Sequence, residues 1–306
     1  MQLFDEVWSA YDKRYAFFEL GKIDWDAMRL EYRSKVAASS TDADAARLIG
    51  AMIGRLNDYH ADLTTPFGVF GPPPIPYPAH FSAQVIRANY LADSIRFTPS
   101  GRMYYARLRS GQGYVNVPSF EGRGWGSEIE QVITDLPGIT GLIVDIRNNG
   151  GGLEDNAMDI AARLYDRSHP YRVTRFRSGA GHGDFTPASI MSLAPAGAVH
   201  FGGPVALITN RFDGSSAEDF TLMLRALPNA VTVGDTTLGA ASNPLSLQLD
   251  NGWRFRVPQS MQSTPDGYVY QWRGLPPGIA VPWDEREIAA GRDPYLAAAV
   301  VALARH

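Results

Sequence analysis

Residues 141–152 read GLIVDIRNNGGG, a continuous apolar run that enters a turn of three glycines. A short apolar run of this kind predicts a buried strand, and the periodic residues that follow, near Asn156 to Tyr165, predict a helix. Glycines at a strand-to-helix turn let backbone N–H groups converge on an anion without a Cβ in the way. A plain tight turn is the simpler interpretation, because the GxxxxGK[ST] pattern of a phosphate loop is absent.

A second strand of the same type, VALIT at residues 205–209, is followed by a turn and then by Ser215, Ser216 and Glu218. A serine with a glutamate three residues later is typical of a capping box that opens a helix. A serine at such a turn can instead expose its hydroxyl at the edge of the sheet, near the positive end of the helix dipole. The N–H of Ser216 would then point at an oxyanion.

The alternation of strands and helices beyond residue 113 predicts an α/β domain. Before it, helical periodicity over the first 60 residues predicts an N-terminal helical domain, with Asp42 or Asp44 capping its third helix. We therefore expect a helical domain at 1–63, a Pro-rich linker with short strands at 64–112, and the α/β domain at 113–306. In this arrangement His60 lies at the end of a helix, where a capping role is the simplest interpretation.

The amino-acid composition restricts the partners and catalytic groups that the chain can have. The net charge of -4 combines 28 basic with 32 acidic residues that are interspersed, which argues against a nucleic-acid partner. There is no cysteine, and all three lysines lie in the first 36 residues, so neither can serve as a catalytic group downstream. The longest apolar stretch, Tyr295 to Ala304, is about half of the ~20 residues that a membrane span needs.

The start of the chain carries no signal-peptide pattern, which leaves the compartment open: cytoplasmic as written, or periplasmic or extracellular if a signal has been trimmed.

Taken in order, five segments resemble the tail-specific (C-terminal processing) and tricorn-type serine peptidases. They are residues 113–120 (GYVNVPSF), 145–152 (DIRNNGGG, like D-x-R-x-N-x-G-G), 215–218 (SSAE), 233–239 (VGDTTLG, like V-G-E-x-T-x-G) and 274–279 (GLPPGI, like G-x-x-P-D-I). The resemblance implies a crotonase-like, spiral ββα catalytic domain. It also implies that the substrate is a peptide or protein and that no metal or cofactor takes part.

The resemblance also assigns roles. Ser215 is favoured over Ser216 as the nucleophile, because the family's nucleophile lies three residues before the glutamate. The tail-specific branch has its lysine base where this chain has Ala240. The tricorn-like branch uses a histidine in a Leu-x-Asp-x-His segment, which residues 56–60 resemble, so His60 is the expected base. An unperturbed imidazole would titrate near ~6.5.

The remaining expected site residues are the oxyanion donors, Gly150 or Gly151 together with Ser216, and Gln271. The chain has Gln271 where the tricorn-like branch has a glutamate, and Tyr59 where it has a serine. The Gln271 carbonyl is expected to orient His60, although an amide brings no charge to the imidazolium. Asp58, Asp62 or another carboxylate could supply that charge, and the sequence does not rank them. Two alternatives remain: a catalytically weak or inactive member that binds a peptide or an apolar ligand, and an esterase or amidase that shares the site.

Overall fold

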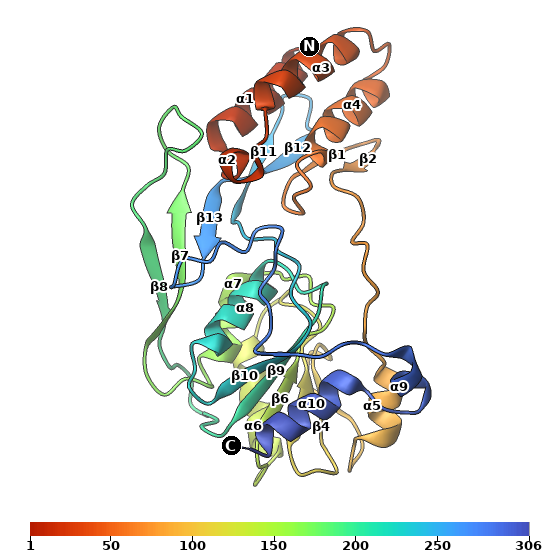
Figure 1. The fold of residues 1–306 in the computed structure, drawn as a ribbon, viewed down its shortest axis with the longest axis vertical. Coiled ribbons are helices and arrows are strands. Elements are labelled where there is room, and N and C mark those ends of the chain that lie inside the picture. The colour runs from red at the N-terminus through yellow and green to blue at the C-terminus, as the bar shows by residue number, and fades with distance from the viewer. Residues whose placement is uncertain (306) are drawn as a thin grey trace.

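The computed structural model describes residues 1–305 and shows a small helical part joined to a larger α/β part (Figure 1). The helical part holds α1 (Gln2–Arg14), α2 (Phe18–Gly21), α3 (Trp25–Ala37) and α4 (Asp42–Gly54). Asp24 caps α3, as its side chain accepts a hydrogen bond from the N–H of Ala27. Thr41 caps α4, so the predicted cap at Asp42 or Asp44 is wrong by one to three residues.

A four-stranded sheet underlies these helices and draws its strands from both ends of the chain. Its order is β11-β12-β1-β2, with β1 (Asp62–Thr65), β2 (Gly68–Phe70), β11 (Pro244–Gln248) and β12 (Arg254–Pro258). Strand β1 pairs antiparallel with β12, with Asp62 opposite Arg256. The sequence predicts that the helical domain ends at residue 63. In the structure, residues 244–258, from the expected catalytic domain, add two strands to the sheet of the helical part.

The larger part is built on a seven-stranded mixed sheet of order β14-β10-β9-β6-β5-β4-β3. The strands from β5 to β14 are parallel, and β3 and β4 continue the sheet as antiparallel strands. The strand bounds are β3 (Arg96–Phe97), β4 (Tyr104–Arg107), β5 (Gly113–Asn116), β6 (Leu142–Asp145), β9 (Val205–Thr209), β10 (Ala230–Gly234) and β14 (Ile279–Ala280). Parallel strands of this kind are buried on both faces, which explains their continuous apolar sequences.

Helices cover both faces of this sheet. One face packs against α6 (Trp125–Asp135), α7 (Glu154–Ala161) and α8 (Ser216–Arg225). The other face packs against α5 (Ala83–Asn89) and α10 (Pro294–Leu303), and the short α9 (Glu285–Ala289) precedes α10. The predicted α/β class with an N-terminal helical part is confirmed. No helix in residues 1–305 is both long and apolar enough to cross a membrane.

A third, three-stranded sheet runs up one side of the molecule (Figure 1). It consists of β7 (His169–Phe176), β8 (Ser189–Leu193) and β13 (Ser260–Ser263), in the order β13-β7-β8. The loop between β7 and β8 reaches the helical part, where His182 Nε2 lies 2.9 Å from the Asp12 carboxylate. This contact and the shared four-stranded sheet tie the two parts together.

One predicted segment has a different secondary structure. Alternating apolar residues from 82 to 109 predict only short strands, but residues Ala83–Asn89 of this segment form α5. Ser82 starts the helix by accepting a hydrogen bond from the N–H of Val85, and the helix buries Ile86 against the sheet. The alternation misled because a helix of seven residues is too short to display its period clearly.

Candidate active site

The two strands that the sequence singled out, β6 and β9, are direct neighbours in the central sheet and run parallel. Their carboxyl ends therefore lie at the same edge, where ligand sites of open α/β sheets form. The glycine turn follows β6 and the Ser215 turn follows β9, so the sheet brings the two turns together. The N–H of Gly214 donates to the Asn149 carbonyl over 3.1 Å, which fastens one turn to the other.

Ser215 lies immediately before α8 in an unusual backbone conformation, with φ 57° and ψ -127°. A non-glycine residue at positive φ costs on the order of 1–3 kcal/mol and persists only where its surroundings enforce it. The Ser215 side chain makes no capping hydrogen bond within the described chain. The capping-box interpretation is therefore wrong for Ser215, and its hydroxyl is left for the pocket.

Glu218, the other half of the expected capping box, has a different task. Its buried carboxylate accepts hydrogen bonds from the Thr237 hydroxyl, the Gly239 N–H and the Ala240 N–H, the last two at 2.8 and 2.7 Å. Burial raises its pKa to about 7, and these hydrogen bonds oppose that effect. Glu218 thus anchors segment 237–240, which forms one wall of the pocket.

The glycine turn packs directly beneath Ser215. A Cβ on Gly151 would lie 2.7 Å from the Ser215 Cβ, so only glycine allows this approach. The Gly151 N–H is already bound to the Asn149 side chain, at 2.9 Å. By contrast, the N–H groups of Gly150 and Ser216 have no acceptor among residues 1–305. Of the expected donors, Gly150 and Ser216 are therefore free, and Gly151 is not.

Buried polar contacts hold both turns from below. Asp213 accepts hydrogen bonds from the N–H groups of Asn149 and Asn210, at 3.2 and 2.8 Å. Arg147 is buried between two carboxylates, Asp145 and Asp293, and its guanidinium bonds to both. A fully paired buried network of this kind rigidifies its surroundings. The D-x-R-x-N segment thus supports the turn rather than lining the pocket.

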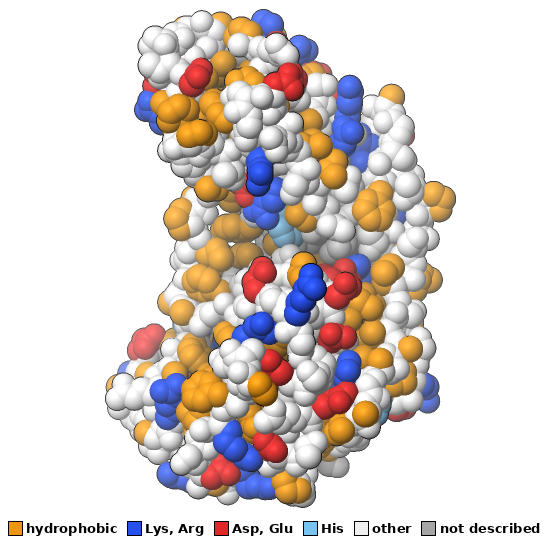
Figure 2. Space-filling model, turned by 180° about the vertical axis from the view of Figure 1, so that it is seen from behind, with side chains coloured by type: hydrophobic (Ala, Val, Ile, Leu, Met, Phe, Trp, Pro, Cys, Tyr) orange, Lys and Arg blue, Asp and Glu red, His pale blue; other side chains and the backbone are white. Residues whose placement is uncertain are grey.

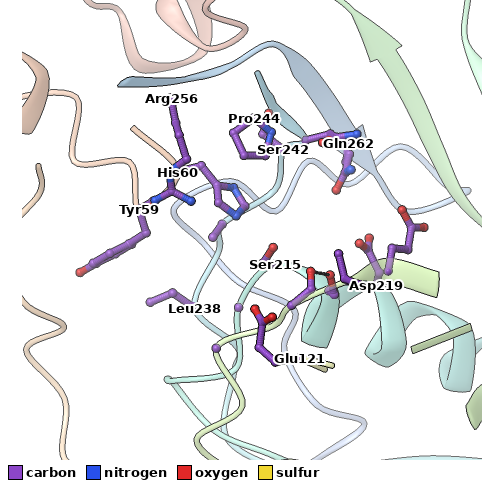
Figure 3. Close-up of a pocket in the computed structure, with 18 of the residues that line it drawn as sticks. Tyr59, His60, Glu121, Ser215, Asp219, Leu238, Ser242, Pro244, Arg256 and Gln262 are labelled. Atoms are coloured by element: carbon purple, nitrogen blue, oxygen red, sulfur yellow. Dashed lines mark hydrogen bonds between the residues drawn. The ribbon is translucent and has the colours of Figure 1, made fainter. Parts of the chain in front are cut away.

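His60 reaches the same pocket from the helical part. Helix α4 ends at Gly54, six residues earlier, so a helix-capping role for His60 is excluded. Strand β1 begins two residues after His60 and pairs with β12, which ties this segment to the four-stranded sheet of the helical part. Ion pairing between Arg256 and Asp62 reinforces the register. The side chains of His60 and Ser215 face each other across the pocket (Figure 3).

The environment of His60 changes its expected titration. Its side chain is largely buried, and burial lowers its pKa to about 4, with a further lowering by the Arg256 charge. The ordinary value near ~6.5 is therefore not what this site provides. A neutral imidazole at neutral pH is the form that can accept a proton. The Nδ1 atom of His60 is buried and has no hydrogen-bond partner within residues 1–305.

Gln271 does not make the contact that the sequence predicted. Its Oε1 accepts a hydrogen bond from the Ala241 N–H at 2.7 Å, and no hydrogen bond joins it to His60 in the described chain. Its Nε2 is buried without a hydrogen bond. Burial raises the pKa of the nearby Asp58 carboxyl, and the Gln271 amide opposes that rise. The reason for the difference is that the backbone of segment 240–242 needs the amide oxygen.

The pocket around Ser215 has a volume of about 580 Å³. It opens where the surface is hollowed between the helical part and the α/β part (Figure 2). Sequence reasoning missed most of the residues that line the pocket. These include Arg256 from β12 and four carboxyl groups from the α/β part: Glu121, Glu154, Asp155 and Asp219. Only the pairing of β1 with β12 brings Arg256 here, and no local pattern signals that pairing. Within residues 1–305, no three His, Asp or Glu side chains gather as a metal site.

The close packing of Gly151 predicts a contrast between two neighbouring glycines. Gly151→Ala should displace Ser215 and lower turnover by roughly 10²-fold or more, since small misplacements of reacting groups cost that much. Gly150→Ala keeps its N–H, and its Cβ would meet no described atom within 4 Å, so its activity should stay close to that of the wild type. Steady-state hydrolysis by both variants measures the difference. Equal losses would contradict the packing.

The comparisons with known proteins identify the family of the chain. The family model for peptidase family S41 matches residues 111–281, and the model for the tricorn protease C1 domain matches residues 1–54. Both matching models describe protease families, and they define the class of protein. The chain belongs to peptidase family S41.

Individual relatives lie on both branches of the resemblance. A chloroplastic C-terminal processing peptidase from Tetradesmus obliquus is 26% identical over 203 residues, which are 64% of this chain and 42% of that protein. Tricorn protease homolog 1 from Streptomyces coelicolor is 28% identical over 210 residues, covering 65% of this chain and 17% of that protein. The chain thus spans less than half the length of these relatives.

A solved structure from Parabacteroides merdae, described as that of a candidate peptidase, matches almost the whole chain. Its TM-score is 0.88 at 29% identity, covering 98% of this chain and 95% of that one. The helical part, the hairpin that completes it and the α/β part are therefore shared as one arrangement.

Proposed function

We propose that this chain hydrolyses peptide bonds with Ser215 as nucleophile and His60 as general base. The observation that carries the proposal is the strained Ser215 at the start of α8, whose hydroxyl caps nothing and faces a neutral, buried imidazole. Neither residue alone is specific, but a serine and a histidine that meet from two separate parts of the chain fit nucleophilic catalysis.

The proposed steps use the facing positions of the two side chains. Ser215 Oγ bonds to the scissile carbonyl carbon, and its proton passes to His60, which then gives it to the leaving amine as the C–N bond breaks. His60 Nδ1 is buried, so Nε2 is the nitrogen that handles this proton. A water molecule then gives a proton to His60 as its oxygen bonds to the acyl carbon. The bond from that carbon to Ser215 Oγ breaks, and His60 returns the proton to Ser215. The cycle leaves the enzyme unchanged and needs no metal or cofactor.

The oxyanion of the tetrahedral intermediate would be bound by the free N–H groups of Gly150 and Ser216. Both lie at the pocket, and that of Ser216 belongs to the first turn of α8. Preorganised donors at a helix N-terminus favour the negative charge that develops in the reaction. Removing one such donor generally costs ~10²–10³ in rate, so the glycine turn contributes to catalysis as well as to packing.

The direct test is hydrolysis of an unfolded protein or a peptide library, followed by mass spectrometry of the products. The wild type should release new amino and carboxyl termini, and Ser215→Ala should not. Hydrolysis of simple esters without peptide cleavage would favour the esterase alternative. Retention of a peptide without cleavage would favour a binding module, a reading that the unpartnered His60 Nδ1 supports.

Gln271→Glu is expected to lower activity at pH 7 rather than restore the family's glutamate. The new carboxyl would be buried beside Asp58, and two carboxyls in one buried place cannot both ionise easily. The pair should keep a proton to higher pH, so the acid limb of the pH–rate profile should move upward. The pH dependence of kcat measures this. A higher kcat with an unmoved limb would show that a charge at position 271 acts on His60 directly.

A further inference from the structure

A buried carboxylate lies two residues before His60. The Asp58 side chain is fully buried, and its Oδ1 accepts a hydrogen bond from the backbone N–H of His60 at 2.9 Å. Its Oδ2 accepts one from the hydroxyl of Tyr15 at 3.1 Å. Tyr15 is itself fully buried among the aromatic residues of the helical part. A carboxylate in such a place is costly to the fold and calls for a function.

Each element packed around Asp58 contributes polar or charged groups. Tyr11 of α1 and Tyr15 just after it come from the helical part. Burial, and after it the Asp58 charge, raises the pKa of both phenols. Arg256 of β12 favours the ionised form of Asp58, and so does Gln271 Nε2 of the α/β part. Asp62, the nearest other carboxylate in the sequence, is already paired with Arg256.

His60 needs a negative charge that its expected partner does not supply. When His60 takes the Ser215 proton it becomes an imidazolium, and in a buried site that cation is strongly disfavoured without an anion. Gln271 is an amide, and its oxygen is bound to Ala241. Among the residues that hold the His60 segment, Asp58 is the carboxylate fixed to His60 itself by a hydrogen bond.

We propose that Asp58, in its ionised form, is a positioning residue that holds the His60 segment and stabilises the imidazolium formed during the reaction. This inference rests on the proposed function, because it assigns the charge that the Ser215 and His60 pair requires. It places the negatively charged residue of the site two residues before the base, in the helical part, rather than at position 271 in the α/β part.

The pH dependence follows from the environment of each group. Burial raises the pKa of Asp58 to about 6, and burial lowers that of His60 to about 4. Both groups must be deprotonated for catalysis, so activity rises with pH through each pKa. The higher value sets the visible acid limb, which we expect near pH 6 and assign to Asp58 rather than to His60.

The experiment measures the rate at which a fluorophosphonate labels Ser215, as a function of pH from 4 to 9. This reaction requires an activated serine and no knowledge of the natural substrate. Asp58→Asn keeps the shape and the acceptor for the His60 N–H but removes the charge. It should lower the plateau rate by roughly 10²-fold. The acid limb near pH 6 should disappear, leaving only that of His60 near pH 4.

Tyr15→Phe is the second variant, and it removes only the hydroxyl group of the side chain. It removes a hydrogen bond that favours ionised Asp58, so the acid limb should move to higher pH while the plateau stays nearly level. Asp26→Asn is the matched control, because it removes one negative charge from the exposed surface of the helical part without touching the His60 segment. Its acid limb should stay near pH 6.

The outcomes separate the two proposals. If the wild type shows no labelling at any pH, the proposed function fails. If the wild type is labelled but Asp58→Asn and Tyr15→Phe leave the acid limb in place, Asp58 is only structural and the inference is overturned. Should Asp58→Asn fail to fold by circular dichroism, the direction of the Tyr15→Phe shift decides alone.

Discussion

Ser215→Ala is expected to abolish peptide hydrolysis, with a loss on the order of 10⁴–10⁶ in kcat. The hydroxyl makes no capping bond in the fold, so its removal should leave the melting temperature nearly unchanged. Alanine also fits the site sterically, since it only removes one atom. Peptide hydrolysis and a thermal melt, measured on the same preparation, give both quantities.

Ser216→Ala is the matched control next to it in the chain. The Ser216 hydroxyl donates to the Gly152 carbonyl at 2.8 Å, and only its backbone N–H serves the proposed oxyanion site. The variant should lose about 1 kcal/mol of stability and keep most of its activity. If the pattern is reversed, with Ser216→Ala inactive and Ser215→Ala active, the nucleophile is Ser216.

His60→Ala is expected to lower turnover by roughly 10⁴-fold, because the base that activates Ser215 is lost. The buried ring also fills space, so His60→Gln is the better test of chemistry alone, as it keeps most of the volume. Both variants should bind peptide while failing to cleave it. The measurements are kcat and KM for a cleaved peptide, with a thermal melt to check the fold.

The matched control for His60 is His200→Ala, since His200 is exposed in a loop far along the chain. It should retain wild-type activity. His182 is less suitable, because it contacts Asp12 of the helical part and its loss should reduce stability. Full activity in His60→Gln would show that the base is another group.

Much of the site could be predicted from local sequence. The strands before Gly150 and Ser215 are continuous apolar runs, and the turns after them carry the glycines and serines to which the family resemblance assigned roles. Each of these patterns lies within one short segment, so it can be recognised without knowledge of the fold. The meeting of β6 with β9 also follows, because successive parallel strands commonly become neighbours.

What the sequence could not provide depends on distant pairing and on burial. The β11–β12 hairpin completes the sheet of the helical part, and no short-range pattern indicates that strands so far apart in the chain will pair. The same pairing delivers Arg256 to the pocket and holds His60 in place. The lowered pKa of His60 and the raised pKa of Asp58 come from burial, which appears only once the two parts are packed.

Gln271 shows how a family pattern can mislead at one position. Its place in the sequence predicts a partner for His60, but its oxygen is bound to the Ala241 N–H in the folded chain. The backbone demand for a hydrogen bond outweighs the expected side-chain contact. In our proposal, the negative charge that relatives carry at this position comes instead from Asp58, which lies two residues before His60 in the sequence.

The central claim, that His60 activates Ser215 across the junction of the two parts, is tested most directly by fluorophosphonate labelling of the intact wild-type chain at pH 8. Mass spectrometry should find one adduct per chain, located on Ser215, and the His60→Gln variant should react at a rate lower by orders of magnitude. An unlabelled wild type, an adduct on another residue, or equal labelling of the two proteins would contradict the account.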